Sequence, residues 1–124
     1  MTHYLMLAEV LAIHQDQVVR YGGSHGVRDP GALEAALFRP QTGYYNDLIE
    51  EAAALWESLC QNHPFIDGNK RTAFAVIYTF LRINGYMITA GADDIYALIS
   101  DFYGKNMFEF SALEKVLRQN TRKV

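Results

Sequence analysis

The chain of 124 residues is long enough for one domain, because domains typically hold roughly 100 to 150 residues. Half of its residues are hydrophobic and 20% are charged, which is typical of a packed globular protein and argues against a disordered one. The net charge of -3 argues against a general attraction to phosphate backbones, so we expect no direct nucleic-acid binding. We predict a single domain over residues 1–124.

The cysteine content and the apolar runs indicate a cytoplasmic protein. Cys60 is the only cysteine, so an intramolecular disulfide is excluded, and we interpret it as a structural thiol on an apolar helix face. The N-terminus lacks the basic start and cleavage pattern of a secretory peptide. The longest apolar run, residues 73–81, is shorter than the roughly 18 residues of a membrane span.

The first expected helix covers residues 5–20, because apolar positions recur there at intervals of three and four. The stripe consists of Leu7, Val10, Leu11, His14, Val18 and Tyr21, of which His14 is half polar. Gly22 and Gly23 end this helix. The glycine-rich loop over residues 21–28 is either a flexible connection or a segment that bends over a ligand.

Two further helices are expected before the middle of the chain. Asp29 and Pro30 form a strong helix start, and Arg39 before Pro40 ends that helix near Phe38. Residues 41–46 are irregular, and residues 47–61 carry a clear apolar stripe. We interpret the acidic residues of this helix as a solvated face without a catalytic role: Asp47, Glu50, Glu51 and Glu57.

The second half of the chain completes an all-α pattern. Residues 69–84 form an apolar helix that we expect to be buried on most sides, and Gly85 ends it. Residues 86–89 could be extended but are too short to predict a sheet. A helix is expected from residue 92 or 93 to 103, and a capping-box pattern at Ser111 to Glu114 opens a last helix that ends near residue 120. We therefore predict a compact bundle of about six helices around a central buried helix.

The stretch from His63 to Thr72 is densely polar and directly precedes the most apolar run. If the buried helix begins at Asn69, the loop before it lies at the positive end of the helix dipole, where unpaired amides bind anions. Gly68 would let the backbone approach a ligand, and Lys70 and Arg71 add the positive charge that phosphates require.

A metal ion and a base complete the expected site. Asp67 would be misplaced beside an anion unless a divalent cation lies between them, which indicates Mg²⁺. His63 can accept a proton near neutral pH, whereas Phe65 would anchor the loop in the core. Taken singly, His63 also fits a structural histidine, and Asp67 and Asn69 fit helix caps. Taken together, these residues predict phosphoryl or nucleotidyl transfer to a hydroxyl.

The segment His63-Pro64-Phe65-Ile66-Asp67-Gly68-Asn69-Lys70-Arg71 resembles the signature of the Fic/Doc superfamily. The general Fic pattern, HPFx(D/E)GNGRxxR, has a glycine where this chain has Lys70 and a final arginine where it has Phe74. Both differences match the Doc branch, whose shorter pattern is HxFx(D/N)xNKR. The resemblance also includes residues 20–23, 29–31, 72–73 and 84–85, and so covers nearly the whole chain.

The resemblance implies the Fic/Doc fold and the toxin of a type II toxin-antitoxin pair. Such a toxin is an ATP-dependent protein kinase that transfers the γ-phosphate to a threonine of elongation factor Tu and so inhibits translation. By motif position, His63 would activate the target hydroxyl, Asp67 would hold Mg²⁺, and the nucleotide would be bound by Gly68, Asn69, Lys70 and Arg71. The resemblance also implies a Phd-type antitoxin as the partner. No inhibitory (S/T)xxxE(G/N) helix is evident in this chain, so inhibition would have to come from another chain.

Several points stay open at this level. Arg20 lies in a region shared with the Doc branch and is a candidate substrate or nucleotide contact. One alternative activity is Fic-type AMP transfer to a protein hydroxyl, although Lys70 and Phe74 disfavour it. Another is a catalytically inactive domain that only binds the antitoxin. A metal-dependent phosphohydrolase is weaker, because no second His/Asp pair completes a metal site.

Overall fold

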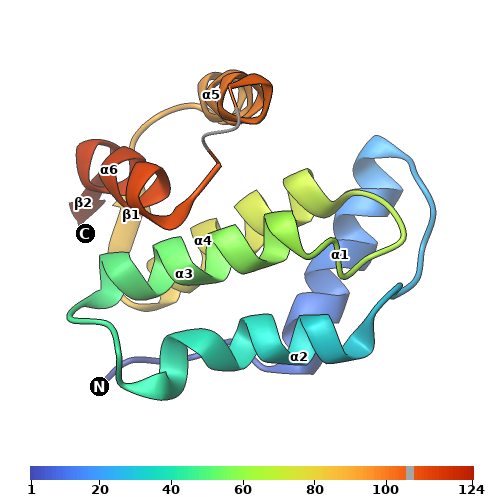
Figure 1. Ribbon diagram of the computed structural model, residues 1–124, viewed down its shortest axis with the longest axis horizontal. Helices are drawn as coiled ribbons and strands as arrows, with labels where there is room; N and C mark the ends of the chain where they lie inside the picture. Colours follow the sequence, from blue (N-terminus) through green and yellow to red (C-terminus); the bar gives the residue numbers. More distant parts are fainter. Residues whose placement is uncertain (106–107) are drawn as a thin grey trace.

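The computed structural model describes residues 1–105 and 108–124, and within these ranges the chain forms six α-helices (Figure 1). Their bounds are α1 Leu7–Tyr21, α2 Pro30–Phe38, α3 Leu48–Gln61, α4 Asn69–Ile83, α5 Ala92–Gly104 and α6 Phe110–Asn120. A short 3-10 helix, η1 (Arg39–Thr42), follows α2, and two short strands are β1 (Tyr86–Ile88) and β2 (Thr121–Lys123). The predicted all-α architecture is confirmed.

The starts of two helices follow from the residues that cap them. The Asp29 side chain accepts a hydrogen bond from the Ala32 N–H (3.0 Å), and Pro30 occupies the first position of α2. Asp47 accepts from the Glu50 N–H (2.9 Å) at the start of α3. These local signals explain why both starts could be predicted from sequence.

Helices α3 and α4 pack against each other and share the centre of the molecule. Helix α6 and helix α2 cover α3, whereas α1 packs on α4. The largest fully buried side chains include Trp56 of α3 and Phe80 of α4. The predicted central helix is therefore one of a central pair, and α3 has ten buried residues against seven for α4.

The two strands form a small antiparallel sheet, which corrects the expectation that residues 86–89 make no sheet. Tyr86 pairs with Lys123, Met87 with Arg122 and Ile88 with Thr121. The partner strand is the basic tail that directly follows α6. Because this pairing joins segments far apart in the chain, neither segment alone indicated it.

Two acidic residues of α3 are not on a solvated face, contrary to expectation. Glu51 is only 9% exposed and accepts a hydrogen bond from the Tyr4 hydroxyl, which raises the pKa of Tyr4. Glu57 forms an ion pair with Arg39 (2.8 Å) and accepts the Phe110 N–H at the start of α6. The position of α3 in the centre explains both contacts, since its first and third turns are covered by other segments.

The capping box predicted at Ser111 is also wrong. Helix α6 begins at Phe110 after Glu109, and no side chain of the N-cap residue accepts a helical N–H. The Phe110 N–H instead meets the Glu57 carboxylate from α3. A tertiary contact thus replaces the local cap.

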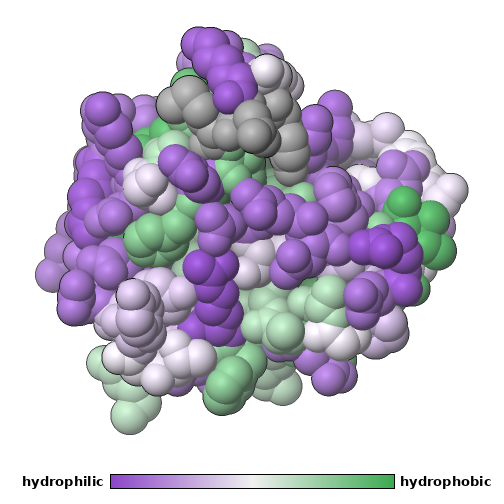
Figure 2. All heavy atoms as spheres, viewed as in Figure 1, coloured by the Kyte–Doolittle hydropathy of each residue, from purple (hydrophilic) through white to green (hydrophobic). Residues whose placement is uncertain are grey.

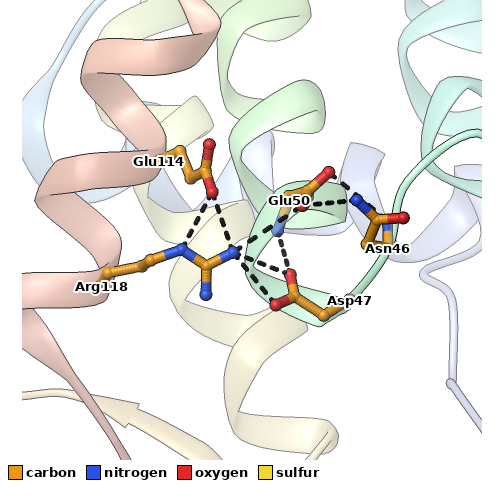
Figure 3. A network of polar contacts seen from close by, with 5 residues as sticks. All are labelled: Asn46, Asp47, Glu50, Glu114 and Arg118. Carbon is orange, nitrogen blue, oxygen red and sulfur yellow. Dashed lines mark hydrogen bonds and ion pairs between the residues drawn. The ribbon is translucent and has the colours of Figure 1, made fainter.

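An ion-pair network joins α6 to the start of α3 (Figure 3). The Arg118 guanidinium lies 2.9 Å from Glu114, 3.0 Å from Asp47 and 3.9 Å from Glu50. Asn46 completes the group through the Glu50 carboxylate.

The face of the molecule shown in Figure 2 is a mosaic of hydrophilic and hydrophobic residues. None of the helices in the described ranges has the length and apolar character needed to cross a membrane.

Candidate active site

Two loops lie side by side at the end of the bundle that is remote from the chain termini (Figure 1). One connects α1 to α2, and the other connects α3 to α4 and carries the polar motif. The N–H groups of Arg28 and Asp29 both donate to the Pro64 carbonyl (2.8 and 3.0 Å), and the Ile66 N–H donates to Gly26 (3.1 Å). The loop after α1 is thus paired with the motif loop rather than a free connection.

The Arg28 side chain fastens the same junction. Its Nε donates to the His63 carbonyl (2.7 Å) and its Nη2 to the Asn62 carbonyl (2.7 Å). Both carbonyls follow the C-terminus of α3, where a positive charge is favourable. Arg28 therefore fixes the position of the His63 backbone.

His63 has a backbone conformation unusual for a residue with a side chain, with φ at +45°. This left-handed region is sparsely populated outside glycine, and such strain is found where surrounding contacts hold it. The imidazole is exposed and makes no hydrogen bond to the described residues. Its ring lines an open pocket of about 340 Å³ that is formed by His63, Ile66, Asp67, Gly68, Asn69, Lys70 and Arg71.

The floor of the pocket is the N-terminus of α4. Gly68 precedes the helix in the left-handed conformation (φ 73°), and the first helical hydrogen bond runs from the Thr72 N–H to the Gly68 carbonyl (2.9 Å). The N–H groups of the three residues between them have no helical partner. An anion in this pocket would meet these N–H groups and the positive end of the helix dipole.

Asp67 presents an exposed carboxylate at the edge of the pocket. Its Oδ1 accepts the Gly68 N–H (2.9 Å) and its Oδ2 accepts the Ser24 N–H (3.2 Å). Gly23, with φ at +114°, lies so close that a Cβ atom there would be 2.8 Å from Oδ2. The loop after α1 thus requires glycine where it passes the carboxylate.

Asn69 uses its side chain to hold the motif loop. Its Oδ1 accepts the Phe65 N–H and its Nδ2 donates to the Phe65 carbonyl, both at 3.0 Å. The side-chain amide is thus bound to the loop, while the backbone N–H of Asn69 has no acceptor within α4. Nucleotide binding by Asn69 stays a prediction.

Phe65 is 1% exposed and anchors the loop in the core, where it also forms an isolated bridge with Val27. Its ring stacks on the imidazole of His14, with centroids 3.9 Å apart and planes at 8°. His14 Nε2 lies 2.9 Å from the Asp67 carbonyl oxygen. Sequence reasoning placed His14 in an apolar stripe and missed this contact, although a titratable side chain in a buried stripe was a signal.

Arg71 lies between two aromatic rings. Its Cζ is 4.4 Å from the centre of the Tyr21 ring at the end of α1 and 5.3 Å from that of Tyr96 in α5. Burial raises the pKa of Tyr96, and the positive charge of Arg71 partly opposes this shift. Lys70 is exposed beside Arg71. The site therefore has two cations, of which one is held by stacking.

Arg20 is not brought to the pocket lining. Its guanidinium pairs with Asp16 one turn earlier in α1, with Nε 2.9 Å from Oδ2. Both side chains are more than half exposed. Within the described part of the chain, no hydrogen bond or ion pair joins Arg20 to the motif loop.

The Fic/DOC family model matches residues 4–81, which include both loops and helices α1 to α4. The chain therefore belongs to the Fic/DOC family and, by the Lys70 and Phe74 positions described above, to its Doc branch. It is 45% identical over 98 residues to a protein named Toxin Doc from Mycolicibacterium smegmatis, covering 75% of this chain and 73% of that protein. It is 38% identical over 84 residues to Protein kinase doc of Escherichia phage P1, covering 64% of this chain and 67% of that protein.

Proposed function

We propose that the chain is the toxin of a type II toxin-antitoxin pair and acts as an ATP-dependent protein kinase. It would transfer the γ-phosphate of ATP to a threonine of elongation factor Tu in the cytoplasm and so inhibit translation. The observation that carries this proposal is the pocket in which His63, Asp67 and the N-terminus of α4 meet. The names of the two relatives, a toxin and a protein kinase, support it.

The exposed imidazole of His63 is the proposed base. It accepts the proton of the target hydroxyl, whose oxygen attacks the γ-phosphorus. The bond from the γ-phosphorus to the bridging oxygen of the β-phosphate breaks, and ADP leaves with that electron pair. Imidazole is suited to this proton transfer because it titrates near neutral pH.

The N-terminus of α4 would bind the phosphates. The N–H groups of the first turn of α4 have no acceptor within the helix, and Lys70 and Arg71 belong to this turn. These fixed dipoles and charges stabilise the negative charge that is redistributed during transfer. Gly68 has no side chain that would separate the phosphate from the backbone.

Asp67 is the residue that would hold Mg²⁺. Mg²⁺ binds through one or two carboxylates together with substrate phosphates and waters, and an exposed carboxylate beside an anion pocket fits this pattern. The described residues contain no group of three or more His, Cys, Asp or Glu side chains that could hold a metal by itself. The ion is therefore expected to bind together with ATP, and it would neutralise charge on the phosphates.

Phe74 and Lys70 favour phosphate transfer over AMP transfer. Phe74 is 8% exposed and packs near the rings of Trp56 and Tyr96, so no cation stands where the AMP-transferring pattern has its last arginine. Lys70 replaces the glycine that would admit a phosphate close to the backbone. We therefore place γ-phosphate transfer ahead of AMP transfer.

A Phd-type antitoxin is the proposed partner that silences the toxin. The relative named as a toxin supports an antitoxin for this chain as well.

Arg20 stays a candidate contact for the protein substrate, because its guanidinium is on the surface of α1 beside the loop that flanks the pocket. Substituting Arg20 by alanine would then raise the KM for the target protein more than the KM for ATP.

Two labelled nucleotides test the reaction. The full chain is incubated with Mg²⁺, elongation factor Tu and ATP labelled at either the γ- or the α-phosphate. Label on elongation factor Tu from the γ-position alone is the expected result, whereas label from the α-position would establish AMP transfer instead. His63→Ala should abolish both transfer and growth arrest. Growth arrest that survives in His63→Ala would contradict catalysis and favour a domain that only binds its antitoxin.

A further inference from the structure

We propose that His14 is a positioning residue of this site, which sets the Asp67–Gly68 peptide and the Phe65 ring so that the Asp67 carboxylate faces the nucleotide. Its consequence for activity depends on the proposed kinase function. The geometry itself does not, because it concerns contacts between α1 and the motif loop. His14 does not line the pocket, so it acts through Asp67.

The hydrogen bond of His14 has a defined direction. His14 is 4% exposed in the middle of α1, and its Nε2 lies 2.9 Å from the Asp67 carbonyl oxygen. A carbonyl oxygen only accepts hydrogen bonds, so Nε2 must carry the proton. A buried N–H that is matched to one backbone carbonyl fixes the position of that carbonyl relative to α1.

The peptide plane carries this constraint to the carboxylate. The Asp67 carbonyl and the Gly68 N–H belong to one planar trans peptide and point in opposite directions. At the opposite edge of this peptide, the Gly68 N–H donates to Asp67 Oδ1 (2.9 Å). Rotation of this peptide away from His14 would therefore move the N–H that holds the carboxylate.

The ring of His14 adds a second constraint. It stacks on Phe65 with centroids 3.9 Å apart, and the Phe65 backbone is itself held by Oδ1 and Nδ2 of the Asn69 side chain. Gly68 lies beside the same imidazole, since a Cβ there would be 3.9 Å from Nε2. An imidazole provides both a flat face and an N–H donor. Phenylalanine would keep only the face, and glutamine only the donor.

A purely structural role would predict a different pattern of losses. Groups that orient a metal ligand from behind typically change metal affinity or activity by about 10- to 100-fold when they are removed. Loss of packing alone would lower stability without changing the Mg²⁺ requirement. A positioning role and a packing role can therefore be separated by comparing two His14 variants with a variant of another buried residue in α1.

The test compares His14→Phe, His14→Gln and Val10→Ala in the full chain. Val10 is fully buried in α1, one turn before His14, and serves as the stability control. In γ-label transfer to elongation factor Tu, His14→Phe should raise the half-saturating Mg²⁺ concentration by about 10-fold and lower kcat. His14→Gln should recover most of this loss, and Val10→Ala should keep the wild-type Mg²⁺ dependence.

A second measurement does not require activity. In the protein without nucleotide, hydrogen exchange of the Gly68 amide, followed by NMR, should be about 10-fold faster in His14→Phe than in wild type and Val10→Ala, and near normal in His14→Gln. Equal exchange in His14→Phe and wild type would overturn the proposal. A loss of transfer that is equal in the Phe, Gln and Val10→Ala variants would also overturn it, because packing would then explain the effect. If wild type transfers no label at all, the kinase proposal fails, and the exchange result alone decides the role of His14.

Discussion

Replacement of Asn69 by alanine should lower the free energy of unfolding by about 1 to 3 kcal/mol, since two hydrogen bonds of roughly 0.5 to 1.5 kcal/mol each are lost. These bonds join the side-chain amide to the Phe65 N–H and carbonyl, both at 3.0 Å. Asn69 is only partly buried, so water can reach the freed groups, and the lower half of this range is expected. The melting temperature should fall by about 4 °C per kcal/mol for a chain of this length.

Urea titration of the variant measures this change directly. The midpoint should fall at an unchanged m-value, because the native state stays compact. Asn62→Ala is the matched control, because the Asn62 side chain is exposed and makes no hydrogen bond to the described residues. It should change the unfolding free energy by less than about 0.5 kcal/mol. An equal, small effect of both substitutions would refute the view that the Asn69 amide holds the motif loop.

Four further outcomes follow from other features of the structure. Arg118→Ala should cost about 0.5 to 1 kcal/mol at low salt and less in 1 M NaCl, as measured by urea titration, because the Arg118 and Asp47 side chains are 42% and 48% exposed and their ion pair is screened by salt. Burial alone would raise the pKa of Asp47, but a backbone N–H and Arg118 lower it overall from 3.8. The stability that the Asp47 carboxylate contributes is therefore full above about pH 4 and is lost as pH falls. The unfolding free energies of Asp47→Asn and wild type should therefore converge in acid. Tyr21→Leu should cost about 0.5 to 1 kcal/mol by removing one ring from Arg71, measured by thermal unfolding against Tyr21→Phe, which keeps the ring. Cys60 is fully buried and should react with a thiol reagent only as fast as the protein opens, which a colorimetric assay in increasing urea would follow.

Local chemistry made most of the helices predictable. Asp29 and Asp47 cap α2 and α3 by hydrogen bonds within three residues, and Pro30 stands where a helix can begin. Gly68 and Asn69 likewise mark the start of α4 at the predicted place. Signals of this kind depend only on neighbouring residues, so they can be read without knowledge of the rest of the fold.

Contacts between distant segments were the part that could not be predicted. The β1 and β2 strands pair across more than 30 residues, and each is too short to be recognised alone. Glu51 was interpreted as solvated because nothing in its own helix indicates that Tyr4 covers it. In the same way, the motif alone shows that His63 and Asp67 are close, but not that His14 supports them from α1. The chemical groups of the candidate site can thus be predicted from one segment, whereas the contacts from α1 that hold them in place cannot.

The close approach of Gly23 to Asp67 has a genetic consequence. If the chain is a toxin, cells that survive its expression carry mutations that inactivate it, and such survivors can be sequenced in bulk. A Cβ at Gly23 would lie 2.8 Å from Asp67 Oδ2, so replacement of this glycine should inactivate the protein without altering any residue of the motif. Gly22 also has a positive φ, which disfavours other residues, but nothing lies within 4 Å of an added Cβ there, so it should appear less often among survivors. The mutations found in survivors should therefore mark the loop between α1 and α2 as well as the proposed catalytic residues.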